Sequence, residues 1–150
     1  MKKPASRVRK GPRMKLRLFL MSLALCVTLP IGAENAPETP LGKNMESLSS
    51  TYKALRKETD PAKSAALARD AQQIVAKCLT ETPALLAKMP AGATKAMAAA
   101  EFRKTLGKVF VTFCELEQAG LAGKTEDIAK CLESLKDLKK TGHEKFTEEE

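Results

Sequence analysis

Apolar side chains recur every three or four residues along four stretches of this chain, which is the spacing of a helix that buries one face. Asp60 and Pro61 separate the first two stretches, because Asp is a favourable N-cap and Pro suits the first helical position. The second stretch ends at Pro83. The apolar faces of these two predicted helices hold Leu41, Met45, Leu48, Tyr52 and Leu55, and then Leu67, Ala71, Ile74 and Cys78.

The other two stretches are predicted to form a helical hairpin. The third helix runs from about residue 94 to residue 119 and is followed by Gly120 and Gly123, which flank a tight turn. Thr125 is a suitable N-cap for the fourth helix. The apolar faces of this hairpin hold Ala99, Phe102, Leu106, Val109, Phe113 and Leu116, and then Ile128, Leu132, Leu135, Leu138 and Phe146.

The connections between these stretches indicate how the helices are arranged. The first and last connections are short, and the middle one, residues 83–93, is a longer loop whose apolar Leu85, Leu86 and Met89 predict that it folds back over the bundle. No stretch of the sequence alternates apolar and polar residues as a strand would. The sequence therefore predicts an all-α fold, an antiparallel up-down-up-down four-helix bundle.

The N-terminal segment has a different pattern, that of a secretory signal peptide. Residues 1–17 hold eight basic residues and no acidic one, and a short apolar run follows them as far as Leu29. That run is too short to cross a bilayer comfortably, and Ala33 offers a small residue at a cleavage point. We therefore expect a cleaved signal peptide at 1–33, a flexible lead-in at 34–40, one bundle domain at 41–147 and an acidic tail at 148–150.

Removal of this leader changes the charge of the protein. Eight of the 26 basic residues lie in positions 1–33, and the 18 that remain equal the 18 acidic residues, all of which lie at position 34 or later. The net charge of +8 therefore belongs to the leader. The mature part has no basic block with interleaved aromatic residues, so nucleic-acid binding is disfavoured.

Met45 and His143, the only histidine, are the candidate ligands of a cofactor or metal. In a four-helix bundle the start of the first helix and the end of the fourth lie at the same end, so these two side chains share one pocket. Each also has an ordinary interpretation, since a lone histidine is usually solvated and a methionine on an apolar stripe usually packs in the core. Met89 and Met97 compete with Met45, because they belong to the same end of the bundle.

Four ordered segments carry a resemblance to a known family. They are residues 44–48 (Asn-Met-Glu-Ser-Leu), 102–103 (Phe-Arg), 123–124 (Gly-Lys) and 143–146 (His-Glu-Lys-Phe). Over roughly residues 41–147 the chain resembles the soluble cytochrome b562 family, whose bundle architecture is well known. The resemblance implies a periplasmic, monomeric electron carrier that exchanges electrons with redox partner proteins and has no enzymatic activity.

The resemblance also implies one non-covalently bound haem b per chain, with the Met45 sulfur and a His143 ring nitrogen as axial ligands of the iron. The sequence has no Cys-x-x-Cys-His segment for covalent haem attachment. Lys139 and Thr147 stand where the family has arginines that meet the haem propionates, and Lys139 or Lys140 can supply a point charge instead. The implied haem wall consists of Leu41, Leu48, Phe102 and Leu106, with Pro83 and Leu86 near the ring edge.

Two features leave alternatives open. The missing arginines and the alanine-rich residues 96–100 also fit a haem-free periplasmic bundle that serves as an interaction or stress-related protein. Cys114 and Cys131 lie at matching heights on the predicted hairpin, so a disulfide and two free thiols are both open. Cys78 is expected to be a buried thiol, with a bond to a haem vinyl group or an intermolecular disulfide as alternatives.

Overall fold

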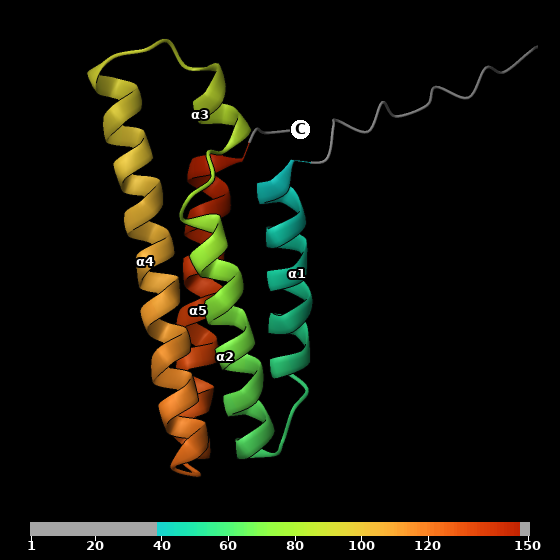
Figure 1. Ribbon diagram of the computed structural model, residues 1–150. Helices are drawn as coiled ribbons and strands as arrows, with labels where there is room; N and C mark the ends of the chain where they lie inside the picture. The colour runs from blue at the N-terminus through green and yellow to red at the C-terminus, as the bar shows by residue number, and fades with distance from the viewer. Residues whose placement is uncertain (1–38, 148–150) are drawn as a thin grey trace, which may run out of the picture. The chain divides into compact units, whose positions relative to one another are not determined.

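The structure, a computed structural model, describes residues 39–147, which form four long helices and one short one without any strand (Figure 1). The predicted all-α class is confirmed. The predicted signal peptide, the acidic tail and the lead-in up to residue 38 lie outside the described residues. The helices are α1 (Pro40–Leu55), α2 (Pro61–Cys78), α3 (Ala84–Lys88), α4 (Ala93–Leu121) and α5 (Thr125–Phe146).

The first two helices begin with the same combination of a side-chain cap and a proline. The Thr39 hydroxyl accepts a hydrogen bond from the Gly42 N–H at 3.0 Å, and the Asp60 carboxylate accepts one from the Ala62 N–H at 2.9 Å. The predicted cap at Asp60 is thereby confirmed. Helix α1 begins at Pro40, the last residue of the predicted lead-in, because Thr39 already supplies a cap.

The turn between α4 and α5 is a Schellman motif built on Gly123. The Lys124 N–H donates to the Ala119 carbonyl at 2.9 Å, the Gly123 N–H donates to the Gly120 carbonyl at 3.0 Å, and Gly123 has a φ of 69°. The prediction that Thr125 caps α5 was wrong. The N-cap is Lys124, because the residue that closes the turn leads directly into the helix.

The long connection between α2 and α4 was predicted as a loop, but it contains the short helix α3. Pro83 precedes the helix, and the helix ends at Met89, whose extended backbone is the conformation that the following Pro90 favours. Leu86 is only 1% exposed and belongs to the hydrophobic core. The apolar residues of this connection thus fold back onto the bundle, as expected.

Helices α2 and α4 pack closely through small residues. A Cβ atom on Gly120 would lie 2.6 Å from the Pro61 carbonyl oxygen, so only glycine allows this approach. Leu67 and Ile74, which were predicted to face inward from α2, are half-buried. The side of α2 that faces inward carries smaller residues, and its buried members are Ser64, Ala65, Ala68, Ala71, Val75 and Cys78.

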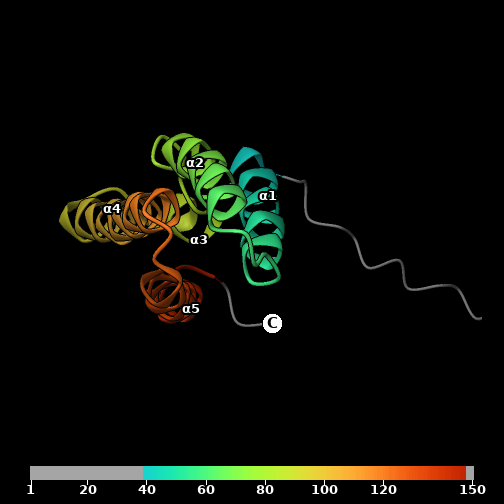
Figure 2. The same cartoon turned by 90° about the horizontal axis from the view of Figure 1, so that it is seen from below.

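The hydrophobic core lies where α1, α2, α4 and α5 meet, and one edge of the bundle stays open. Helix α1 packs on α2, α2 on α4 and α4 on α5, whereas α1 and α5 barely touch (Figure 2). A hydrogen bond from the Tyr52 hydroxyl to the Leu132 carbonyl, 3.3 Å long, crosses this α1/α5 edge. Within residues 39–147, no helix combines the length and the apolar character that a membrane span requires.

Candidate functional site

A cavity of about 580 Å³ opens at the α1/α5 edge, toward the end of the bundle that carries α3. Its volume falls in the usual range for small-molecule sites, about 300–1,000 Å³. The walls come from α1, α4 and α5, and the residues around the start of α3 close one side. Most of the lining side chains are aliphatic or aromatic, and no carboxylate from the described residues is among them.

Met45 and His143 both line this cavity, from α1 and from α5 respectively. Met45 is half-buried and packs against the hydrophobic core, while His143 is exposed at the cavity mouth. Within residues 39–147 the His143 imidazole makes no hydrogen bond or ion pair, although its backbone carbonyl accepts a hydrogen bond from Thr147. The cavity thus presents a thioether and a ring nitrogen, both of which are ligands for haem iron.

The apolar wall matches the sequence-based expectation at most positions. Leu41, Leu48, Phe102, Leu106 and Pro83 line the cavity. Leu86 does not, because successive residues of a helix point about 100° apart and α3 turns Leu86 into the core. The neighbouring Leu85 lines the cavity in its place.

Several cavity residues were not predicted as part of the site. Six of them lie on the apolar stripes of the sequence, so their inward direction could be predicted but their part in a cavity could not. The Phe146 ring packs edge-on against the Phe102 ring, with centroids 5.2 Å apart, and so fixes one wall. The additional lining residues on these stripes are Tyr52, Val109, Phe113, Leu135, Leu138 and Phe146.

Lys139 is the lysine that lines the cavity among the described residues, and it is exposed at the mouth one helical turn before His143. Lys140 does not line the cavity, and its ammonium lies 3.9 Å from the Glu144 carboxylate. Of the two lysines considered for a propionate, only Lys139 therefore has a place on the cavity wall. Thr147 also lines the mouth, at the second position where the family has an arginine.

The rival methionines lie away from the cavity wall. Met97 is 74% exposed on α4, and Met89 is half-buried at the end of α3. Neither residue lines the cavity. Among residues 39–147 no group of three or more His, Cys, Asp and Glu side chains could hold a metal ion. Of the three methionines considered as ligands, Met45 is the one that lines the cavity together with His143.

Cys114 and Cys131 are free thiols. Of the two alternatives that their matching heights on the hairpin allowed, the disulfide is therefore not formed. Both side chains are only partly buried. Equal height on a hairpin was therefore not sufficient for a bond, because a disulfide also requires that the two Cβ atoms face each other at close range.

Cys78 is a free thiol in the core. Its side chain has no exposed area, and burial raises the pKa of the thiol from 9.0 to about 11. Cys78 does not line the cavity. A thiol with so high a pKa has almost no reactive thiolate at neutral pH, so this environment favours the buried, unreactive state over a bond to a ligand.

Fold and cavity together define a class of protein: an all-helical bundle whose apolar cavity presents one thioether and one imidazole. The comparison with known families agrees with this class, because the family model of cytochrome b562 matches residues 40–147. The chain belongs to the cytochrome b562 family. Searches of curated proteins and of solved structures give no significant match.

Proposed function

We propose that this protein is a periplasmic electron carrier that binds one haem b non-covalently in the cavity between α1 and α5 of an antiparallel up-down-up-down bundle. The observation that carries the proposal is that Met45 and His143, nearly a hundred positions apart in the sequence, line one apolar cavity. The family membership supports the same function. The basic and apolar N-terminal residues 1–33 support export as a signal peptide.

The residues present fit a haem. The apolar walls suit a flat hydrophobic ring, and the exposed Lys139 at the mouth suits a propionate that points toward solvent. His143 has no competing hydrogen bond among the described residues, so its ring nitrogens are available to a metal. The open α1/α5 edge gives a planar ligand a path into the cavity.

When bound, the haem supplies an iron that accepts and releases one electron. The chain's own contribution is to position two neutral ligands, the Met45 thioether and the His143 imidazole, and thioether ligation raises the reduction potential. With both residues bound to the iron, no position would be left for substrate activation. The leucine and phenylalanine wall would keep water from the ring, which also tunes the potential.

The first test is a haemin titration of residues 34–150, followed by reduction and absorption spectroscopy. The wild-type protein is expected to bind one haem per chain and to give a low-spin spectrum with sharp bands on reduction. Met45→Ala and His143→Ala should each lose the low-spin spectrum. Met97→Ala is the matched control, because Met97 is 74% exposed and lies off the cavity wall, and it should bind haem like the wild type.

A wild-type protein that binds no haem would overturn the proposal. It would favour the alternative of a haem-free periplasmic bundle that acts through partner proteins. A low-spin spectrum that survives Met45→Ala would instead contradict the ligand assignment while leaving haem binding in place.

A further inference from the structure

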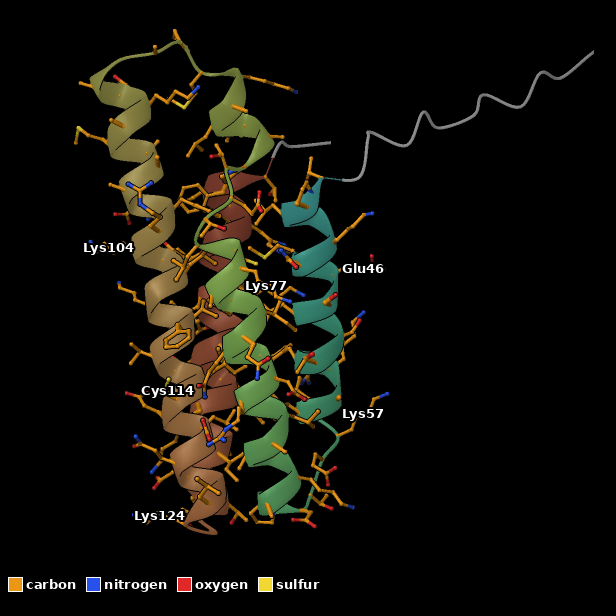
Figure 3. All side chains as sticks on the ribbon, viewed as in Figure 1. Glu46, Lys57, Lys77, Lys104, Cys114 and Lys124 are labelled. Atoms are coloured by element: carbon orange, nitrogen blue, oxygen red, sulfur yellow. The ribbon has the colours of Figure 1, made fainter. Side chains whose placement is uncertain are left out.

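Helix α4 carries a line of residues on its outer side that the rest of residues 39–147 leaves largely uncovered. From Met97 to Leu121 these residues are spaced alternately by three and four positions, which is the spacing of the contact face of a coiled-coil helix. We call the residues at positions 97, 100, 104, 107, 111, 114, 118 and 121 the α4 stripe. None of them is buried, and Lys104, one of them, points away from the other helices (Figure 3).

The exposed large apolar side chains of residues 39–147 all lie on this stripe. They are Met97, Val111 and Leu121, which are 74%, 55% and 70% exposed. Single exposed apolar residues are ordinary on a protein surface, but their concentration on one helical line indicates a contact. Beside Val111 the stripe borders a groove between α4 and α5, and Gly107 contributes no side chain that would fill it.

The stripe can pack against a second copy of itself about position 109. Met97 and Leu121 each lie twelve positions from this point, and Gly107 and Val111 each lie two positions from it. An antiparallel copy with a two-fold axis at this point therefore sets Met97 against Leu121 and Gly107 against Val111. Such a contact is isologous, because one patch on each copy meets the same patch on the other.

The charged residues favour an antiparallel pair over a parallel one. A parallel pair would set Lys104 opposite Lys104, and like charges in a seam repel. In the antiparallel pair, Lys104 and Glu115 come to nearly the same height, on the side where both line the groove. Glu115 makes no ion pair within residues 39–147, and Lys104 makes only an exposed one, 3.6 Å from Glu101. Asp137 of α5 lines the same groove, so the match depends on Lys104 and Glu115 and not on a net charge.

The size of the stripe fits a weak and reversible contact. Helix α4 has 29 residues, and at about 1.5 Å per residue and about 10 Å in diameter it offers a strip of roughly 440 Å² per copy. Ser134 and Asp137 of α5 extend this strip across the groove. Two copies together bury roughly 1,000 Å², which is the lower end of the range for specific interfaces.

We infer that a second copy of this chain docks antiparallel on the α4 stripe, so that the protein forms a weak homodimer. The family resemblance implies a monomer, so the dimer is a property of this chain's own α4. The inference goes beyond the proposed function and does not rest on it, because no residue of the stripe lines the cavity. Haem binding and dimerisation therefore succeed or fail separately.

Sedimentation equilibrium of residues 34–150, with a reductant present to prevent disulfides, measures the dimer. The mass of the wild type should rise from one chain toward two between micromolar and millimolar concentration. Val111→Glu should weaken the dimer by at least about tenfold, because it places an unpaired charge in the seam. Ala76→Glu, at an exposed position of α2, is the matched control and should dimerise like the wild type.

Two results would overturn the inference. One is a wild type that stays a monomer over the whole concentration range. The other is equal weakening of the dimer by Val111→Glu and Ala76→Glu. Circular dichroism shows that each variant is folded, and Met97→Glu repeats the test at a second exposed position of the stripe if Val111→Glu is not.

A charge exchange tests the antiparallel orientation. Lys104→Glu and Glu115→Lys should each weaken the dimer about three- to tenfold, because each sets like charges side by side. An equimolar mixture of the two variants should restore the wild-type affinity, since every contact between them again pairs a glutamate with a lysine. A mixture that associates no more tightly than the separate variants would contradict the antiparallel dimer.

Discussion

At the scale of single residues, Glu117 on α4 shows how a surface carboxylate joins two helices. It accepts hydrogen bonds from Gln72 at 2.7 Å and from the Arg69 Nε atom at 2.8 Å, both on α2. Only 13% of the Glu117 side chain is exposed, although Arg69 is mostly in solvent. These hydrogen bonds, with Gln72 the larger influence, hold the pKa of Glu117 below its ordinary value of 4.5.

The pH dependence of stability follows from this shift. Because the pKa of Glu117 is lower in the folded state than in the unfolded state, its contribution is present above about pH 4.5 and is lost as pH falls through the lowered folded pKa. Glu117→Gln should therefore lower the melting temperature at pH 7 and have a smaller effect at pH 3. Thermal unfolding followed by circular dichroism measures both values.

Glu115→Gln is the control for this prediction, because Glu115 is exposed and makes no ion pair within the described residues. It should change the melting temperature little at either pH. If Glu117→Gln lowers the melting temperature equally at pH 3 and pH 7, lost packing is responsible for the loss of stability, and not the ionised carboxylate.

At the scale of elements, the closest approach in the bundle is that of α4 to the start of α2. A Cβ on Gly120 would lie 2.6 Å from the Pro61 carbonyl oxygen and 2.9 Å from the Ala65 Cβ atom, and neither neighbour is a flexible side chain. Gly107, further up the same helix, has no atom within 4 Å of such a Cβ. The two glycines share a helix and differ in what lies beside them.

These two positions give a matched pair of substitutions. Gly120→Ala should lower the free energy of unfolding by about 1–3 kcal/mol, because the added methyl group pushes α2 and α4 apart. Gly107→Ala should raise it by about 0.5–1 kcal/mol, because alanine favours the helix and meets no neighbour. Urea denaturation measures both, and a stabilising effect of Gly120→Ala would show that the two helices can separate without loss.

At the scale of the whole molecule, the bundle is closed on three sides and open on the fourth. Helix pairs α1/α2, α2/α4 and α4/α5 pack through the core, while α1 and α5 are joined through Tyr52 at one end of the cavity. The opening and the cavity are one feature, because side chains that border this edge also line the cavity. An edge of this kind suits a ligand that completes the core when it binds.

The Tyr52 bridge can be tested in the apo protein. Tyr52→Phe keeps the ring in the cavity wall but removes the donor to the Leu132 carbonyl, so it should lower the free energy of unfolding by about 0.5–1.5 kcal/mol. It should also speed amide hydrogen exchange in α1 and α5 more than in α2 and α4. Hydrogen exchange followed by NMR measures this difference.

Ser47→Ala is the control for the bridge, because the Ser47 hydroxyl donates only to the Lys43 carbonyl within α1. It should leave the exchange of α5 unchanged. If Tyr52→Phe speeds amide hydrogen exchange equally in all four long helices, the bridge has no specific role and the variant has lost stability in general.

The site was predictable where it depends on residue identity and order along the chain. His143 is the only histidine, and Met45 lies on the first apolar stripe, so a bundle with short end connections brings them to one end. The sequence could not predict that Leu85, and not Leu86, lines the cavity, because a loop was expected where α3 forms. One residue of difference in a helix changes the direction of a side chain by about 100°.

By itself the sequence determined the helical class and the approximate extent of the long helices, because helical periodicity is a local property that residue order specifies. The ligand pair of Met45 and His143 stays a prediction. Only the tertiary structure decided which side of each helix meets which neighbour. The inward face of α2 and the open edge beside Tyr52 depend on the rotation of each helix about its axis. That rotation is set by packing between helices, as at Gly120, and no local pattern encodes it.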